Sequence, residues 1–251
     1  MATLEELKQI ARENGELEGW DFSRMSIRRD PIPWDYSSVV RSYLKPTKRV
    51  LDIGTGGGEI FLSLAAHIGK GIGIDHNPAM IKTANRNLAR LAVGNIEFIE
   101  MDGRSLQFEA NEFDLVLLRH LRVYVREIER VLRPGGYFIA QMVGKESSKN
   151  ILEAFGWTSD SFGPDWWQPV GELAQQFQEV GCHIVAQGEY DVRYWFKDTA
   201  SLVFWIMSVP WPEEIELEKH WKNINRVLET STTNRGIETN EHRGLLVVRR
   251  Q

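Results

Sequence analysis

The sequence predicts an α/β fold, with a doubly wound, mostly parallel sheet and helices on both of its faces. Residues 49–143 alternate between strand-like and helix-like segments, an order typical of parallel βαβ units joined by right-handed crossovers. The strand-like segments are apolar at successive positions, as a sheet covered on both sides requires. A glycine-rich turn, "GTGGG", follows the first of these strands and leads into a helix.

The regular part of the chain divides into strands and helices of ordinary length. Strands are expected at 49–53, 71–75, 96–102, 113–120 and 137–143, and helices at 59–69, 77–92 and 124–132. Asn77 suits the N-cap of the second helix, and Pro78 suits its first position. Pro134 and the two glycines after it end the third helix and turn the chain into the last strand.

The flanking segments are less regular. A helix is expected at 2–14, with Leu4, Leu7, Ile10 and Ala11 on one face, and a second one at 36–44. After residue 144 we expect helices at 170–181, 199–209 and 213–229, a long strand at 183–196 with a bulge or bend at Gly188, and a closing strand at 241–250. This predicts one structural domain overall, made of an N-terminal helical segment (1–48), a core (49–144) and a C-terminal part (145–251).

The length and composition of the chain limit the classes of protein to which it can belong. The 251 residues suit one domain with an extension, and 42% apolar with 26% charged residues is an ordinary soluble balance. No run approaches the roughly 18 apolar residues that a membrane helix needs, and the polar N-terminus does not resemble a signal peptide. We therefore expect a cytoplasmic protein with no membrane contact. The single Cys182 and six histidines without ligand spacing predict no disulfide and no metal.

The turn "VLDIGTGGGEI" excludes two common phosphate-binding loops. A P-loop needs a lysine after its last glycine, and none follows here. A dinucleotide loop needs G-x-G-x-x-G, but Glu59 occupies the third glycine position. The carboxylate of Glu59, at the start of the helix, would compete with a phosphate for the positive helix end. The loop therefore favours a cofactor that has no phosphate and carries a cation.

Further motifs follow this loop in order. Its own spacing is D-x-G-x-G-x-G; the next strand ends in "GIDHNP", the third in "EMDG", and a helix leads into "RVLRPGGYF". Together these motifs resemble the class I S-adenosylmethionine-dependent methyltransferases. The resemblance implies a Rossmann-like, seven-stranded sheet, S-adenosylmethionine as cofactor and S-adenosylhomocysteine as product.

The resemblance also implies which residues bind the cofactor. Asp75 is expected to accept hydrogen bonds from the ribose hydroxyls, and Asp102 and Gly103 to contact the adenine. In related enzymes an N-terminal segment folds over the cofactor, which here includes Trp20. The full expected set is Asp52, Gly54, Thr55, Gly56, Gly58, Asp75, His76, Asp102, Gly103, Arg119 and Trp20.

Methyl transfer from a sulfonium needs alignment and exclusion of water more than it needs a catalytic group. A general base is required only for an acceptor that is protonated at the working pH. The candidates are His120, Arg119 and Tyr124, at and after the carboxyl end of a central strand. His120 could act as a general base or hold the acceptor. The alternative is that it is an ordinary polar residue at the end of a strand. Arg119 either binds an anionic acceptor or forms a structural salt bridge.

Aromatic residues are concentrated in the C-terminal part. Trp157, Trp166, Trp167 and the stretch 194–211 either form an aromatic lid over the acceptor or belong to a core. This pattern resembles the bacterial small-molecule methyltransferases of the ubiquinone-biosynthesis (methyltransferase type 11) group. A small-molecule acceptor is therefore expected, and the protein is expected to be a monomer or a homodimer.

Three alternatives remain. An RNA methyltransferase is suggested by arginines 119, 122, 126, 130 and 133 near one helical face, although a solvated, salt-bridged face is the preferred explanation for them. The net charge of −5 and the interleaved Glu127 and Glu129 argue against a nucleic-acid partner. A cofactor-binding protein without transferase activity is the second alternative. An NAD-dependent oxidoreductase is the third, and Glu59 disfavours it.

Overall fold

The computed structural model describes residues 1–46, 48–91, 93–164 and 166–251. These residues form one nine-stranded sheet in the order β1-β7-β9-β6-β5-β2-β3-β4, with β8 paired to β9. The expected count of seven strands omitted the short β1 and β8, which pair at the far ends of β7 and β9. The strands are β1 Ile27–Arg29, β2 Arg49–Ile53, β3 Lys70–Asp75, β4 Ile96–Glu100, β5 Phe113–Arg119, β6 Leu132–Val143, β7 Cys182–Phe196, β8 Thr232–Thr233 and β9 Gly236–Arg250.

The helices of the core begin close to where the sequence predicts them, but the one expected at 59–69 ends at Ser63 and is followed by a separate 3-10 turn at Ala65–His67. The helices are α1 Leu4–Asn14, α2 Tyr36–Tyr43, α3 Glu59–Ser63, α4 Pro78–Leu91, α5 Val125–Val131, α6 Lys149–Phe155, α7 Val170–Glu179, α8 Thr199–Ser208 and α9 Leu217–Ser231. The Oδ1 atom of Asn77 accepts the N–H of Ala79 at 2.9 Å, so Asn77 caps α4 as predicted. Residue 92, the expected last residue of this helix, lies outside the described residues.

Two further local predictions are wrong. Residues 146–169, for which the sequence predicts no helix or strand, contain α6, which is preceded by Ser148 at φ 57° and ends at Gly156 at φ 78°. The register of β7 shifts between Ile184 and Ala186 and not at Gly188. Gly188 stays in regular pairing, and the indole of Trp34 lies beside it, where a Cβ atom would be 3.5 Å from the ring.

The order of the strands predicts where a ligand crevice lies. Strands β4, β3, β2, β5 and β6 pair in parallel, and β9 joins β6 in the antiparallel sense. The chain moves outward from β2 through β3 to β4, and then returns to the other side of β2 for β5 and β6. This reversal creates a topological switch point at the carboxyl ends of β2 and β5, where open α/β sheets bind their ligands.

Helices cover both faces of the core sheet. Val50 and Leu51 are neighbours on β2 that point to opposite faces, and both are completely buried. Val50 belongs to a cluster with residues of α2, α3 and α4, whereas Leu51 belongs to a cluster with residues of α5 and α7. No helix within the described ranges is long and apolar enough to cross a membrane.

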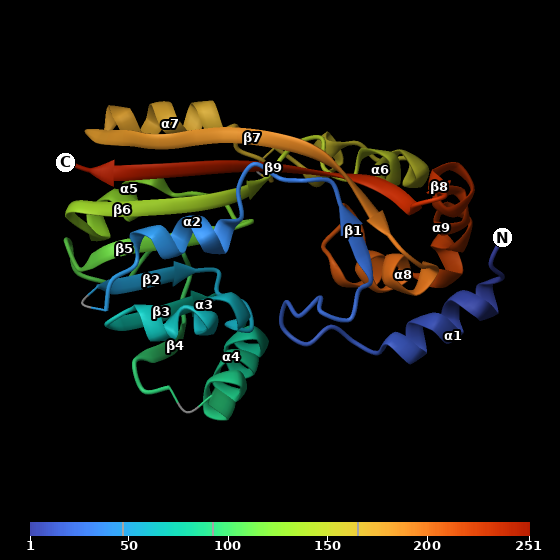
Figure 1. The fold of residues 1–251 in the computed structure, drawn as a ribbon, viewed down its shortest axis with the longest axis horizontal. Helices are drawn as coiled ribbons and strands as arrows, with labels where there is room; N and C mark the ends of the chain where they lie inside the picture. Colours follow the sequence, from blue (N-terminus) through green and yellow to red (C-terminus); the bar gives the residue numbers. More distant parts are fainter. Residues whose placement is uncertain (47, 92, 165) are drawn as a thin grey trace.

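A second group of helices lies beyond the core sheet. Strands β7 and β9 have 15 residues each and run from the core to α1, α6, α8 and α9, which with β1 and β8 we call the distal lobe (Figure 1). Its hydrophobic cluster includes Phe196, Leu202 and Val227 and packs against Trp157, Trp205 and Trp211. Many of the aromatic residues proposed for a lid therefore pack in the core of this lobe, which is the alternative that the sequence left open.

Candidate functional site

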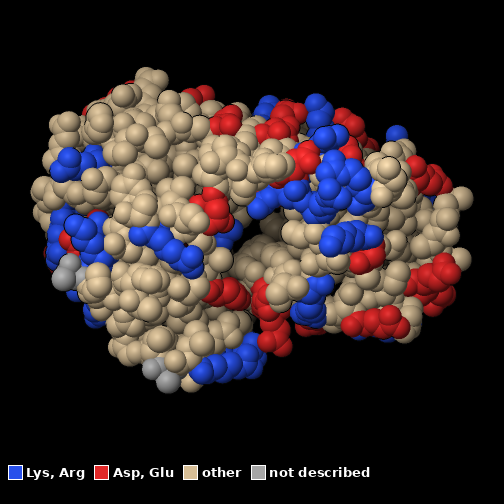
Figure 2. Space-filling view, in the orientation of Figure 1, with Lys and Arg blue, Asp and Glu red and all other residues tan. Residues whose placement is uncertain are grey.

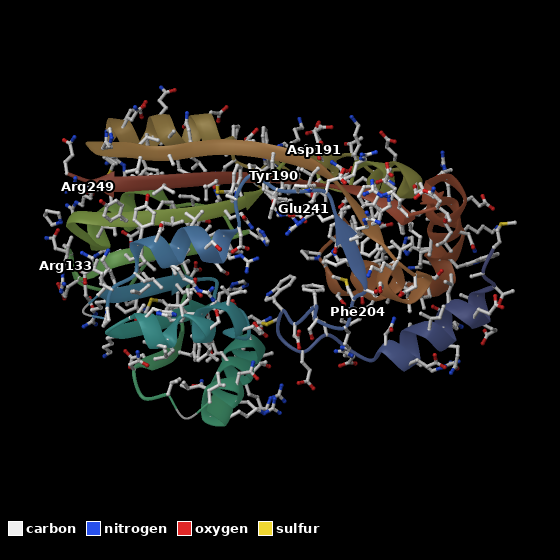
Figure 3. All side chains as sticks on the ribbon, viewed as in Figure 1. Arg133, Tyr190, Asp191, Phe204, Glu241 and Arg249 are labelled. Carbon is white, nitrogen blue, oxygen red and sulfur yellow. The ribbon has the colours of Figure 1, made fainter. Side chains whose placement is uncertain are left out.

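The surface is hollowed between the core and the distal lobe (Figure 2). Lys and Arg side chains gather along the upper rim of this hollow, and acidic side chains lie below it. Tyr190 and Glu241 lie on β7 and β9 at its upper edge (Figure 3). We call this hollow the cleft. The switch point between β2 and β5 lies at the core side of the cleft.

The glycine-rich loop after β2 is tightly folded. Gly54, Gly56 and Gly58 have φ angles of 72°, 57° and 75°, which side chains rarely adopt. The N–H groups of Gly54 and Thr55 both donate to the carbonyl of Ile74, at 2.8 and 2.9 Å. The loop is thereby fixed to the end of β3, directly before Asp75.

Two large apolar side chains lie against this loop. A Cβ atom on Gly54 would collide with the side chain of Leu121, and one on Gly56 would collide with the indole of Trp20. Trp20 and Leu121 are 43% and 42% exposed, which is high for such side chains. The glycines therefore allow a close approach of apolar groups that are themselves open to solvent.

Gly58 serves packing. A Cβ atom there would lie 2.6 Å from Cζ of Phe98, a ring that is only 8% exposed. We expect Gly58→Ala to lower the free energy of unfolding by about 2 kcal/mol, from the strained φ and the displaced ring. Urea denaturation would measure this loss. The control is Gly94→Ala, since a Cβ at Gly94 meets nothing within 4 Å. Equal stability of the two variants would contradict the packing role.

Asp75 is anchored by the backbone around it. Its carboxylate is 8% exposed and accepts the N–H of Gly56 at 3.0 Å and the N–H of Asn77 at 2.9 Å, one on each oxygen. A carboxylate oxygen can accept two hydrogen bonds, so each oxygen keeps one free site. His76 follows directly, with its Nδ1 3.6 Å from an Asp75 oxygen and its side chain 75% exposed.

Asp102 lies beyond the neighbouring strand β4. Its carboxylate is held by Arg104, with nitrogen–oxygen distances of 2.6 to 3.1 Å, and these hydrogen bonds lower the pKa of Asp102 to about 2. Sequence reasoning missed Arg104, which no motif marks. A Cβ on Gly103 would lie 2.9 Å from Ile53, so the chain here packs on the end of β2. Tyr124 directly precedes α5, and its phenol lies near Arg104 at this end of the site.

Asp52 and Arg119 lie at the ends of the two central strands. Burial raises the pKa of Asp52 to about 7, although Thr55 and the guanidinium of Arg119 oppose this increase. The guanidinium of Arg119 lies 5.2 Å from the centre of the Tyr36 ring, and its buried Nε has no hydrogen-bond partner. Arg119 forms no ion pair with any described residue, so the salt bridge considered from the sequence is not formed.

His120 has an unusual backbone conformation at the end of β5. Its φ is 58°, its N–H donates to the carbonyl of Gln141 at 2.8 Å, and its Nε2 lies 3.4 Å from the Gln141 amide nitrogen. The residue is exposed in the cleft. Desolvation of its ring by the surrounding protein, and then the positive charges of Arg243 and Arg119, lower the pKa of His120 well below its usual value, although part of the residue is open to solvent. The ring is therefore neutral at physiological pH and accessible.

The N-terminal segment crosses the glycine-rich loop. The N–H of Trp20 donates to the carboxylate of Glu59 at 3.0 Å, and Glu18 pairs with Arg86 of α4 at 3.0 Å. Glu59, which the sequence placed at the start of the helix, thus holds this segment at the positive helix end. An anionic phosphate would have to compete for that position.

Part of the arginine stripe is structural. Arg130 pairs with Glu127 at 2.9 Å and donates to the carbonyls of Leu106 and Phe108. Arg133 pairs with Asp114 at 3.2 Å. These two arginines support the salt-bridged face and not an RNA footprint. Across the described residues, no three His, Cys, Asp or Glu side chains are grouped so that they could hold a metal ion.

Comparison with known proteins gives sequence relatives for part of the chain. Residues 50–136 match the family model described as "Methyltransferase domain". The ubiquinone/menaquinone biosynthesis C-methyltransferases of Ectopseudomonas mendocina and Pseudomonas putida are 30% and 32% identical over 142 residues. The match covers 52% of this chain and 56% of each relative, so the chain spans about half the length of these relatives.

Solved structures resemble nearly the whole fold. The YcgJ protein of Bacillus subtilis has a TM-score of 0.63 and 17% identity, over 86% of this chain and 98% of its own. A methyltransferase-like protein of Bacillus halodurans also has a TM-score of 0.63. It is 16% identical, and the match covers 86% of this chain and 98% of that protein. At such identities the likeness establishes the fold alone, and it extends well beyond residues 50–136.

Proposed function

We propose that this chain, whose residues 50–136 match the family model of a methyltransferase domain, is a class I enzyme that transfers a methyl group from S-adenosylmethionine to a small-molecule acceptor. S-adenosylhomocysteine would be the second product. The observation that carries the proposal is the pair formed by Gly56 and Asp75 at the switch point. A buried carboxylate fixed to a glycine-rich loop, with free acceptor sites, suits two ribose hydroxyls.

The other residues at the edge of the sheet fit the rest of this cofactor. The ionised Asp102 would accept the adenine amino group, beside the backbone of Gly103. The backbone of Gly54, Thr55 and Gly56 would lie along the ribose and the methionyl part. The exposed faces of Trp20 and Leu121 would cover the apolar parts of the molecule. His76, Asp52, Gly58 and Arg119 complete the proposed set, with Gly58 acting through packing.

The chemistry asks little of the chain beyond placement. The cofactor supplies an activated methyl group with its leaving group in place. The cleft residues would align the acceptor and exclude water, which lowers the barrier through positioning. Where the acceptor is a protonated hydroxyl or amine, the neutral ring of His120 can accept its proton. Tyr124, at the Asp102 end of the site, is the weaker catalytic candidate.

A solved structure with the same fold shows why transfer must be measured directly. A [4+2]-cyclase has a TM-score of 0.54 and 18% identity, over 85% of this chain and 79% of its own. The fold therefore supports more than one reaction. A small-molecule acceptor is proposed over RNA because Arg130 and Arg133 are engaged in structural contacts.

The test uses S-adenosylmethionine labelled in its methyl group. The protein is incubated with bulk RNA or with a deproteinised small-molecule extract, and Asp75→Ala serves as the control. We expect label in the small-molecule fraction, at least tenfold above that with the variant. Label retained on RNA would contradict the small-molecule acceptor. Binding of the cofactor with no label in either fraction would contradict the transferase.

A further inference from the structure

Resting on the proposed function, we propose that the acceptor carries a carboxylate group that pairs with Arg243, with Arg119 beside it. Arg243 lies on β9, opposite Val143 of β6 and Tyr190 of β7. Nothing in the sequence motifs points to it. Its place in the sheet, the charges around it and one unoccupied edge of its guanidinium suit it to this pairing.

The strand registers place Arg243 and Arg119 on one face of the sheet. Arg119 is paired with Gln141, which is paired with Leu245, and Arg243 is two residues from Leu245. Side chains two residues apart on a strand share a face. Strand β9 is the third strand from β2, so Arg243 lies roughly 14 Å across the sheet from the glycine-rich loop. This distance puts Arg243 on the acceptor side of the cleft.

The only carboxylate within 4 Å of Arg243, among the described residues, is already engaged. Glu241 accepts from Arg29, at 3.0 and 3.2 Å, and from the hydroxyl of Tyr190 at 2.7 Å. Its distance to Nε of Arg243 is 3.9 Å, which is too long for a hydrogen bond. Glu241 is thus neutralised mainly by Arg29.

The guanidinium of Arg243 is held in place with one edge unused. Its Nη1 donates to the Ser147 hydroxyl at 3.0 Å and to the His242 carbonyl at 2.8 Å. No acceptor for its Nη2 exists in the described part of the chain, and the side chain is 19% exposed. Burial lowers the pKa of Arg243, but a guanidinium stays protonated at any physiological pH.

The cleft therefore carries excess positive charge. Arg29 and Arg243 lie within 4 Å of Glu241, Arg119 acts electrostatically on Arg243, and His120 is neutral. The acid that acts on Arg119 is Asp52, which is only partly ionised near neutral pH because burial raises its pKa to about 7. A buried cation without a partner is costly, and a carboxylate is the group that a guanidinium pairs with best.

The surroundings of Arg243 suit an acid with an aromatic or apolar body. Trp34 packs edge-on against Tyr190, with ring centres 4.8 Å apart, and Tyr190 is opposite Arg243 on β7. The Nε1 of Trp34 is buried without a partner. Phenylacetate combines a carboxylate with an aromatic ring and is a suitable probe. Phenylacetamide has the same shape without the charge.

The test compares the two probes on the protein saturated with S-adenosylhomocysteine, by titration calorimetry. We expect phenylacetate to bind at least tenfold more tightly than phenylacetamide. Arg243→Gln should remove this preference, and Arg243→Lys should restore part of it. The matched control is Arg249→Gln, at the far end of β9 from the cleft (Figure 3), which should keep the preference. Equal binding of both probes, or an unchanged preference in Arg243→Gln, would overturn the proposal.

A second measurement separates this proposal from the proposed function. Small-molecule extract is divided on an anion-exchange resin at neutral pH, and each fraction is tested as acceptor. We expect the acceptor in the retained fraction. Arg243→Gln should raise the amount of this acceptor that half-saturates the enzyme at least tenfold, and it should leave the affinity for S-adenosylhomocysteine unchanged. An acceptor in the unretained fraction would refute the carboxylate. If no fraction accepts a methyl group, the proposed function is refuted. The titration with phenylacetate and phenylacetamide, repeated on the protein without S-adenosylhomocysteine, then still tests whether Arg243 binds a carboxylate.

Discussion

Replacing Asp52 with asparagine is expected to stabilise the protein relative to the wild type, by an amount that grows as the pH rises from 5 to 8. Burial raises the pKa of Asp52 to about 7, whereas an unfolded aspartate has a pKa of about 3.9. A group with a raised folded pKa contributes stability that is present below pH 4 and lost as the pH rises through 7. The pKa difference corresponds to at most about 4 kcal/mol.

Urea denaturation at pH 5, 6, 7 and 8 measures this effect. The free energy of unfolding of Asp52→Asn should rise relative to that of the wild type at each step. Asp102→Asn is the control with the opposite sign, because the pKa of Asp102 is lowered to about 2. Its contribution is present above pH 4 and is lost only in more acidic solution. If the free energies of unfolding of the wild type and of Asp52→Asn change in parallel from pH 5 to 8, Asp52 is not held in a desolvated site.

Replacing Asp75 with alanine is expected to weaken the binding of S-adenosylhomocysteine by about 1–3 kcal/mol, a factor of about 5 to 150. The variant loses the proposed acceptor for the ribose hydroxyls. It also leaves the N–H groups of Gly56 and Asn77 without their partner, so the loop loses an anchor. The affinity is measured by titration calorimetry at fixed pH.

Glu100→Ala is the matched control for this variant. Glu100 is the partner of Asp75 in the β3–β4 register, but it is exposed and has no proposed contact with the cofactor. Its affinity for S-adenosylhomocysteine should stay within about twofold of the wild type. Unchanged affinity in Asp75→Ala would refute the assignment of Asp75 as the ribose-binding acid.

The core of the fold could be predicted because its signals are local. Apolar runs set β2, β3 and β5, a capping residue set the start of α4, and glycines set the turn before α3. The loop and Asp75 meet because a parallel sheet brings the ends of neighbouring strands together. Patterns in one strand or one turn therefore located the core side of the cleft.

The other side of the cleft depends on contacts between distant segments, which local patterns do not record. Arg243 and Arg119 share a face only because β9 inserts between β6 and β7. Arg104 holds Asp102 through side-chain geometry and follows no motif. Gly188 looked like a site for a bulge, yet it stays in regular pairing with β9, and its nearest side chain is that of Trp34, far away in sequence. Each of these roles is set by a partner that is remote in sequence.

Titration calorimetry of the wild-type protein with S-adenosylhomocysteine and, separately, with NAD tests the central claim most directly. We expect S-adenosylhomocysteine to bind at one site per chain and Asp75→Ala to weaken this binding. We expect no measurable binding of NAD, because Glu59 and the N-terminal segment occupy the helix end that a pyrophosphate would use. Binding of NAD without binding of S-adenosylhomocysteine would contradict the proposed cofactor.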